Sequence, residues 1–423
     1  VDLGGSGQAA QAIPELEAAN VAVIGPPQTI DPTLGSGQFF HNIAAYGDQA
    51  DIFVGEAANR LGDASNAVVL GIVLEVPSGT EYATYVQDSV TAAGGTYVGT
   101  EYVGLRVQEA TAQILKLQSA IDQYGVNMVA LHGAPFHNEL VLKAMSAAGI
   151  TEIPVVGIHG VATNSIFENS PEDITDDTYG VHSFKTSSSD IEAAPMMTRC
   201  ADLAGYPGED KVNNFAHGFV NSYILHQAIV KAAEQNSGNV TRATLTKALQ
   251  GKFDTMGISC DIDWTTSNHS PCGAPFTMDR ASGGMVPAGE FSEYAEFLDG
   301  VYGIDPVTFE VEIAINSSPD DGITDDVIKV GWIGDLTGPT ASAQAFNAHG
   351  SAAYFECSNA DGGLGGRQWE FFAEDDGYNA EKSAIALTKL IEDENVLALV
   401  DLGGSGQAAQ AIPELEASNV AVI

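Results

Sequence analysis

The two ends of the chain carry nearly the same sequence, and this repeat limits the possible folds more than any other feature. Residues 1–24 and 400–423 differ only in that Ala19 of the first copy is Ser418 in the second. Each copy has the pattern of a strand, a helix and a second strand. A parallel sheet accepts one strand at each position, so both copies cannot fill the same place in one sheet. One copy must therefore complete a neighbouring unit or lie displaced, and we expect the fold to be read in permuted order, from about residue 326 to the C-terminus and continuing at Gly25.

In that order, apolar strands and helices alternate with short connections. The first series has expected strands at 327–333, 368–374, 396–400 and 21–24, and expected helices at 342–359, 380–393 and 8–18. The second series has expected strands at 67–74, 96–102, 128–131 and 155–158, and expected helices at 82–93, 110–124 and 138–148. Such alternation is typical of doubly wound parallel sheets. The sequence therefore predicts two α/β lobes with a cleft at the carboxyl ends of their strands.

The two series assign the chain to lobes as follows. The first lobe is expected to hold residues 326–423 and 1–62, and the second lobe residues 63–186. Helices in 187–256 would return to the first lobe, with short strands and turns in 257–315 after them. The polar turn-formers of 316–325 read as a linker between the natural C- and N-termini.

The chain is strongly acidic. The 423-residue chain has 56 acidic and 16 basic residues, and therefore a formal net charge of −40. Nucleic acids and anionic lipids are bound through Lys and Arg, so neither is an expected partner. The acidic residues are dispersed along the chain, which indicates a solvated coat that suits a salty exterior, where salt screens self-repulsion. An acidic protein of ordinary surroundings is the alternative.

The four cysteines are placed for disulfides rather than for metal. None lies in a Cys-x-x-Cys pair and no histidine stands at zinc-ligand spacing, so no metal site or cofactor is expected. Cys260 and Cys272 bracket a turn-rich segment and are predicted to pair outside the cell. The pairing of Cys200 with Cys357 is left open.

Several segments, once placed in permuted order, resemble the type I periplasmic binding proteins of the branched-chain amino acid class, which serve ABC importers. The stretch 323–339 resembles the mature start of such receptors. Asp375-Asp376, the loop at 4–8 and the tract 259–269 also fit in order and spacing. The resemblance covers nearly the whole chain, and it implies a hinged two-lobed fold that closes on a small ligand. It also implies delivery of that ligand to a membrane permease.

The resemblance places the first-lobe contacts in two loops. Ser6, followed by Gly7, stands where the family holds the ligand carboxylate, and Thr29, preceded by Gln28, stands where a hydroxyl is supplied. Backbone N–H groups of a Gly-rich loop that opens a helix attract a carboxylate, which gives the assignment a physical basis. A tight strand-to-helix turn is the structural alternative for the Gly-Ser-Gly loop.

The second lobe departs from the family pattern. Ser78 replaces the covering aromatic residue, His132 stands beside a second aromatic position, and His159 replaces the acidic partner of the ligand ammonium. An ammonium group without a partner would be costly to bury. The expected ligand is therefore a small polar or carboxylate-bearing, amino-acid-like metabolite. A structural role on a loop is the alternative for each histidine.

These observations predict an extracytoplasmic solute-binding protein and not an enzyme. The loop containing Ser6 lacks a histidine base, and it is not the Gly-x-Ser-x-Gly turn of hydrolases. Asp375 and Asp376 are expected to cap the next helix rather than to act as catalytic acids. Two alternatives stay open: a receptor-like unit of a tandem or head-to-tail filament, which the end repeat favours, and the sensing domain of a signalling receptor.

Overall fold

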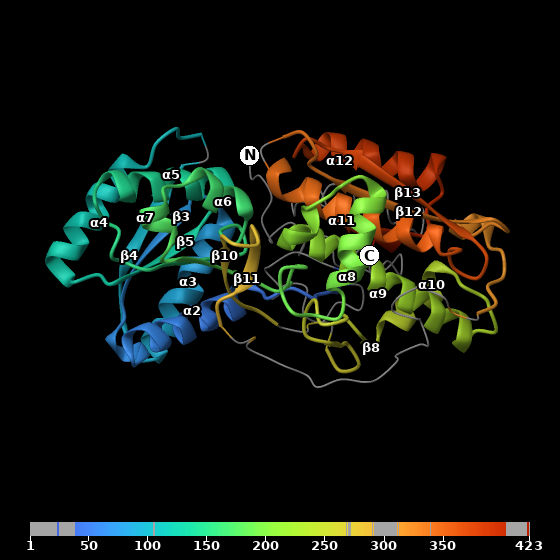
Figure 1. Ribbon diagram of the computed structural model, residues 1–423, viewed down its shortest axis with the longest axis horizontal. Coiled ribbons are helices and arrows are strands. Elements are labelled where there is room, and N and C mark those ends of the chain that lie inside the picture. Colours follow the sequence, from blue (N-terminus) through green and yellow to red (C-terminus); the bar gives the residue numbers. More distant parts are fainter. Residues whose placement is uncertain are drawn as a thin grey trace. The chain divides into compact units, whose positions relative to one another are not determined.

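The computed structural model describes residues 23–24, 39–104, 106–267, 269, 272–289, 291, 311, 313–338, 340–402 and 421–422. They fall into two compact units (Figure 1). Unit 1 comprises the described parts of Ala44–Ser183 and Cys272–Ser292. Unit 2 comprises those of Gly4–Ile43, Phe184–Pro271 and Glu293–Ile423. Each unit contains a mainly parallel sheet with helices packed on it, which confirms the predicted α/β class.

Unit 1 is built on a sheet whose described strands follow the order β11-β10-β7-β6-β5-β3-β4. The strands are β3 (Val68–Leu74), β4 (Thr96–Val103), β5 (Met128–His132), β6 (Val155–Gly157), β7 (Thr178–His182), β10 (Ala274–Asp279) and β11 (Gly284–Pro287). Strands β3 to β7 are parallel, and β10 and β11 extend the sheet in antiparallel fashion.

Helices cover both faces of this sheet. They are α2 (Tyr46–Leu61), α3 (Pro77–Ala92), α4 (Thr111–Tyr124), α5 (Pro135–Ala147), α6 (Asn164–Asn169) and α7 (Glu172–Thr175). Side chains of a strand alternate between faces, and β3 shows the result. Val69 and Val73 join the apolar cluster that contains residues of α2 and α3. Leu70 and Ile72 join the cluster that contains residues of α4 and α5.

The boundaries of unit 1 differ from those expected for the second lobe. The unit begins at Ala44 rather than at residue 63, and its first segment ends at Ser183 rather than at residue 186. The reason is α2, which packs against α3 and was not assigned from the sequence. The segment that carries β10 also belongs to this unit, because β10 pairs with β7.

Unit 2 holds a second parallel sheet, with its described strands in the order β13-β12-β14-β15. These are β12 (Val327–Gly334), β13 (Gln368–Asp375), β14 (Ala398–Leu402) and β15 (Ala421–Val422). Two short pairs accompany it: β1 (Val23–Ile24) with β2 (Phe39–Phe40), and β8 (Lys252–Phe253) with β9 (Ile262–Asp263). The helices are α8 (Ala194–Ala204), α9 (Asn213–Gln235), α10 (Arg242–Leu249), α11 (Ala341–Ala360) and α12 (Ala380–Thr388).

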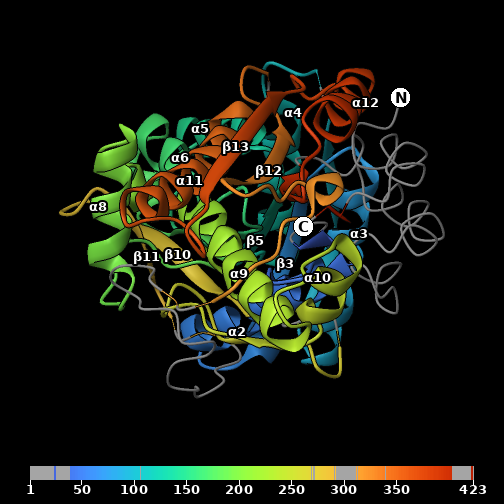
Figure 2. The same cartoon turned by 90° about the vertical axis from the view of Figure 1, so that its right-hand side faces the viewer.

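Helix α9 is the centre of unit 2 and is buried along most of its length. It lies against α11 and α10, and in Figure 2 α9 lies between these two helices. Polar residues of the helix, such as Asn221 and Gln227, are buried together with its apolar ones, which is expected of a helix that packs on several sides rather than on one. Phe215, Phe219 and Tyr223 extend from it into the main apolar cluster of the unit.

The permuted reading of the chain agrees with this packing. Helix α11, from the segment that follows residue 326, packs against α8 and α9 of the earlier segment. In the second copy of the repeat, β14 pairs with β12, and β15 pairs with β14. The first copy supplies β1, which pairs with β2 instead. The filament alternative required residues 326–423 to pack away from residues 25–315, and the structure shows the opposite for the described parts.

The segment expected to be a linker is packed onto unit 2. Ile315 and Ile323 at its two ends are buried in the main cluster. Between them the turn at Pro319–Asp321 is held by hydrogen bonds, among them that from the Lys329 N–H to the Gly322 carbonyl at 3.0 Å. This segment is also fixed against the sheet, because Ile323 pairs with Ile328 at the start of β12.

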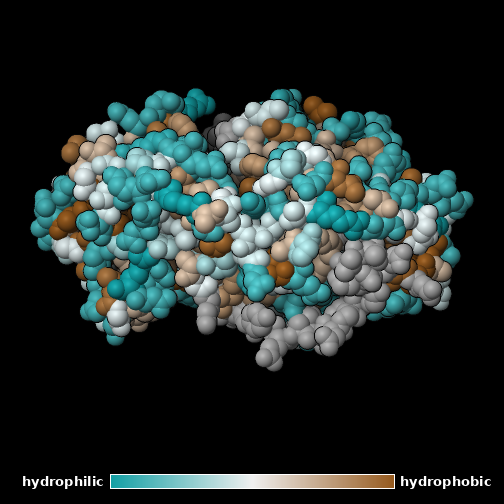
Figure 3. Space-filling model, viewed as in Figure 1, coloured by the Kyte–Doolittle hydropathy of each residue, from teal (hydrophilic) through white to brown (hydrophobic). Residues whose placement is uncertain are grey.

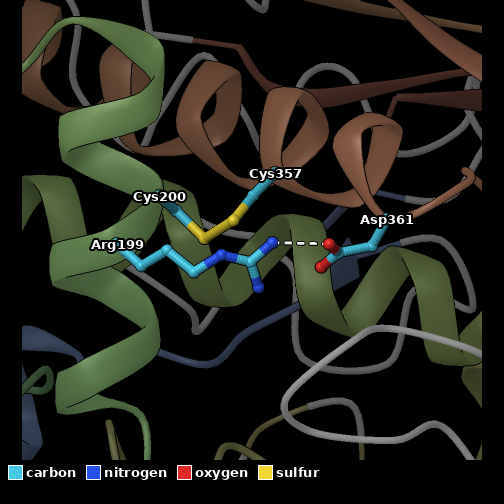
Figure 4. Close-up of a disulfide and its surroundings, with 4 residues drawn as sticks. All are labelled: Arg199, Cys200, Cys357 and Asp361. Atoms are coloured by element: carbon cyan, nitrogen blue, oxygen red, sulfur yellow. Dashed lines mark hydrogen bonds and ion pairs between the residues drawn. A yellow bond between two sulfur atoms is a disulfide. The ribbon is translucent and has the colours of Figure 1, made fainter.

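A disulfide joins Cys200 of α8 to Cys357 of α11 (Figure 4). Both cysteines are completely buried, and an ion pair between Arg199 and Asp361 lies beside them at the surface. The sequence left open whether Cys200 pairs with Cys357, and the structure shows that they do. The bond also fastens the segment after residue 326 covalently to the segment before residue 315.

The surface agrees with the acidic composition. On the face shown in Figure 3, hydrophilic residues predominate and apolar ones form small scattered groups. Among the described residues, no helix combines the length and apolar character needed to span a bilayer.

Candidate functional site

The topology of unit 1 marks one place on its sheet as a binding site. The connection from β3 through α3 leads to β4 on one side, whereas the connection from β4 through α4 leads to β5 on the other. Ligands of such sheets bind outside the carboxyl ends of the strands where the winding direction reverses. That place lies beyond β3 and β5. The sequence had singled out residues after both strands, since Ser78 follows β3 and His132 ends β5.

His132 is buried in a cluster of aromatic rings. Its ring centroid lies 5.4 Å from that of Tyr46 on α2 and 5.7 Å from that of Tyr82 on α3. Nε2 of the histidine is 3.4 Å from the Tyr46 hydroxyl. Burial, together with a smaller effect of the neighbouring His159, lowers the pKa of His132 to about 3. The ring is therefore neutral at physiological pH.

His159 follows β6 and is partly buried, with its Nδ1 shielded from solvent. Its backbone N–H donates to Oε1 of Gln49 at 3.2 Å, and the Gln49 amide donates to the Ala44 carbonyl at 2.7 Å. Helix α2 thus fixes the loop after β6 through one buried glutamine. Burial lowers the pKa of His159 to about 4, so this side chain is also neutral. The loop offers no positive charge to an anion and no carboxylate to an ammonium group at this position.

Neither histidine is expected to become protonated between about pH 5 and 8 in the folded protein. The pKa values of both lie below about 6.5, the value expected in the unfolded chain. The unfolded chain then binds more protons below that pH, so the histidines' contribution to stability is complete above it and falls as the pH drops toward 4. NMR titration of the histidine ring protons measures this directly. The same resonances in urea provide the control, and a folded-state midpoint near 6.5 for both would contradict the prediction.

Three neighbours of these histidines were not identified from the sequence. Tyr46 and Gln49 lie on α2, and Tyr82 is a buried residue of α3 that reads as ordinary core. None of the three had a usable signal in the sequence, because each becomes a neighbour of the histidines only when separate helices pack on the sheet.

The remaining predicted contacts cannot be placed in the same way. Ser6, Gly7, Gln28 and Thr29 lie outside the described residues. Cys260 and Cys272 are buried and disulfide-bonded, and their pairing with each other stays a prediction. Among the described residues, no group of three or more His, Cys, Asp or Glu side chains is arranged to hold a metal ion.

The acidic pair after β13 organises loops, but it does not cap the next helix as expected. The cap of α12 is Asn379, whose side chain accepts a hydrogen bond from the Lys382 N–H. Asp376 accepts from the Tyr378 N–H at 2.7 Å, and Asp375 accepts from the Thr337 hydroxyl at 2.6 Å. Asparagine is as good a cap as aspartate and stands closer to the helix. The carboxylates instead join the turns that follow β12 and β13.

Comparisons with known proteins agree with this architecture. The sequence model of the family described as periplasmic binding protein matches residues 1–279 and 327–423. The described fold is similar to a branched-chain amino acid ABC transporter structure from Thermus thermophilus with bound valine. Identity there is 17%, the TM-score is 0.55, and 70% of this chain and 78% of that chain are covered.

Two further solved structures carry other ligands in their names. A fatty acid ABC transporter substrate-binding protein from Thermomonospora curvata has 13% identity and a TM-score of 0.54, with 72% and 75% of the two chains covered. A solute binding protein from Rhodopseudomonas palustris in complex with p-hydroxybenzoic acid has 15% identity and a TM-score of 0.52, with 68% and 76% covered. No curated protein sequence matches the chain. At these identities the structural likeness concerns the fold alone.

Proposed function

Because the chain belongs to the periplasmic binding protein family, we propose that it captures a small polar metabolite outside the cytoplasm for an ABC importer. The single observation that carries the proposal is the placing of Ser78 and His132 at the point where the winding of the unit 1 sheet reverses. Fold alone does not settle function, so the argument rests on this site. Its groups are suited to holding a solute by hydrogen bonds, and the proposed role involves no chemical change.

The proposed ligand lacks an ammonium group. An α-amino acid needs a carboxylate partner for its ammonium group when the site is closed off from water. The resemblance places that partner at His159, which is neutral here because burial lowers its pKa. The names of the similar structures include valine, fatty acid and p-hydroxybenzoic acid, so the fold accommodates solutes with and without an ammonium group. A small carboxylic acid or amide fits the neutral site best.

The partners follow from this role. The proposal implies a membrane permease that accepts the ligand and an extracytoplasmic location, where disulfides such as Cys200–Cys357 persist. The coat of net charge −40 is suited to that exterior when salt screens it. Self-association into a filament has no support from the packing of the two sequence segments.

A thermal-shift screen tests the ligand class. Valine, isovalerate and isovaleramide share a branched carbon skeleton, while 4-hydroxybenzoate and 4-hydroxybenzamide supply an aromatic pair. A ligand at one hundred times its dissociation constant should stabilise the protein by roughly 2.7 kcal/mol. We expect isovalerate or 4-hydroxybenzoate to stabilise more than valine. Stabilisation by valine alone would contradict the absence of an ammonium partner.

The proposed first-lobe contacts can be tested in the same assay. Strand β14 ends at Leu402, directly before the second copy of the Gly-Ser-Gly loop with Ser405, the counterpart of Ser6. The informative variant therefore changes both serines to alanine. Loss of a hydrogen bond to a charged ligand group costs about 1.5–3 kcal/mol, so the dissociation constant should rise about tenfold or more. Thr29→Ala tests the other predicted loop, which contains Gln28 and Thr29, in the same way.

A further inference from the structure

The first turn of α3 carries backbone N–H groups that can bind a ligand. The first turn of any helix leaves backbone N–H groups without partners inside the helix. Pro77 has no backbone N–H. The free N–H groups at the start of this helix are therefore those of Ser78 and Gly79. Gly79 packs so closely on the end of β3 that an added Cβ would lie 2.1 Å from the Leu74 carbonyl oxygen. Together with the helix dipole, these N–H groups favour a negatively charged oxygen.

A buried histidine nitrogen points to the same turn. Nδ1 of His132 lies 3.3 Å from the position that a Cβ of Gly79 would occupy. His132 is 5% exposed, and its Nδ1 has no hydrogen-bond partner among the described residues. Leaving a buried polar atom unpaired is destabilising, and a ligand oxygen would give Nδ1 the hydrogen-bond partner that it lacks. The unpaired Nδ1 is an observation separate from the helix start. Both observations indicate that a hydrogen-bonding group of a ligand would bind at the same place.

The surroundings of His132 favour a proton on Nδ1. A neutral imidazole has one N–H and one acceptor nitrogen. The Tyr46 hydroxyl beside Nε2 can donate to that nitrogen, which leaves the ring proton on Nδ1, the atom beside the helix start. Nδ1 is then a donor that lies close to Gly79 in the first turn of α3.

The carboxylate of Glu75, at the end of β3, lies away from this position. Glu75 directly follows β3, and its Oε2 lies 3.7 Å from the position that a Cβ of Gly104 would occupy, at the end of β4. Strand β4 is on the opposite side of β3 from β5, which carries His132. The negative charge of Glu75 is therefore turned toward the sheet edge rather than toward the first turn of α3.

We infer that the first turn of α3 and Nδ1 of His132 bind a carboxylate of the solute, which makes the solute a small organic acid. The inference rests on the proposed solute-binding function and names its ligand class. It assigns the carboxylate to unit 1, whereas the resemblance assigned it to the loop containing Ser6. The acid is selected over its own amide, because hydrogen bonds to a charged acceptor are roughly twice as strong as neutral ones.

Calorimetric titration of the full chain with 4-hydroxybenzoate, 4-hydroxybenzamide, isovalerate and isovaleramide tests the inference. In the unaltered protein we expect one of the acids to bind about tenfold or more tightly than its amide. His132→Phe keeps an aromatic ring and removes both nitrogens, so this preference should fall to about threefold or less. His132→Gln restores a neutral N–H donor and should recover part of the preference, and it also serves if the phenylalanine variant fails to fold.

A matched control uses the second buried histidine–tyrosine pair. His226 of α9 lies in unit 2, its Nδ1 is 2.7 Å from the Tyr354 hydroxyl, and burial lowers its pKa to about 3. His226→Phe should leave the preference for the acid unchanged. An unchanged preference in His132→Phe would overturn the carboxylate assignment and leave the solute-binding function intact. If the unaltered protein bound none of the four compounds, both proposals would be rejected for this ligand class.

Discussion

Gly218→Ala is expected to lower the free energy of unfolding by about 3 kcal/mol or more. Helices α9 and α11 cross with their backbones in close contact at this glycine, and a Cβ there would lie 1.9 Å from the Asn347 carbonyl oxygen. Contacts this short cannot be relieved by a side chain, so the helices must separate. Overpacking of a core costs typically about 1–3 kcal/mol and more when backbone has to move. Urea unfolding in concentrated sodium chloride, monitored by circular dichroism, measures the change.

The opposite helix supplies a second test of the same contact. A Cβ at Gly350 of α11 would lie 2.0 Å from the Phe215 carbonyl oxygen, so Gly350→Ala should destabilise by a similar amount. Once one alanine has separated the helices, the second alanine should destabilise the protein less. The double variant should therefore lose less free energy of unfolding than the sum of the two single variants. Gly55→Ala in α2 is the control, because a Cβ there meets nothing within 4 Å. That change should stabilise by up to about 1 kcal/mol. Equal effects at Gly218 and Gly55 would contradict the close crossing.

Removal of the Cys200–Cys357 disulfide should have an effect of similar size. The bond closes a loop of 157 residues in sequence separation. In the chain-entropy model a disulfide that closes such a loop stabilises the folded state by about 5 kcal/mol. Measured stabilisation by disulfides is commonly about 2–4 kcal/mol. The double variant Cys200→Ala/Cys357→Ala is expected to unfold at a lower urea concentration by a corresponding amount. The bond also ties α8 to α11, so its loss should weaken the attachment of the segment after residue 326.

A neighbouring variant separates the disulfide from general disturbance of these helices. Arg199→Ala breaks the ion pair with Asp361 next to the bond, and exposed ion pairs contribute about 0–1 kcal/mol. An equal loss in both variants would show that the bond itself contributes little. Intact-mass measurement of the double alanine variant, with and without reductant, also tests the predicted Cys260–Cys272 bond. A mass change of two hydrogens on reduction is expected, and no change would contradict that pairing.

Much of the fold followed from local patterns. The strand at Val327–Gly334, the helix at Ala341–Ala360 and the strand at Gln368–Asp375 were each predicted to within a residue or two. Apolar periodicity, glycine turns and the order of elements suffice for such assignments, because each depends on neighbours in the chain. Helix α2 was missed, since its apolar face is interrupted by polar residues such as Gln49 and Glu56 that are buried only in the folded unit.

The site divides in the same way. The sequence by itself determined that Ser78 and His132 stand at the carboxyl ends of two strands of the same lobe, because strand ends and alternating elements are local features. Only the tertiary structure decided that Tyr46 lies beside Nε2 of His132 and the start of α3 beside its Nδ1, since these groups come from separate helices. The pKa of His132 was decided in the same way, because it depends on how completely the folded unit excludes water from the ring. Composition and periodicity state which residues are present along the chain, and burial and proximity arise from contacts between distant segments.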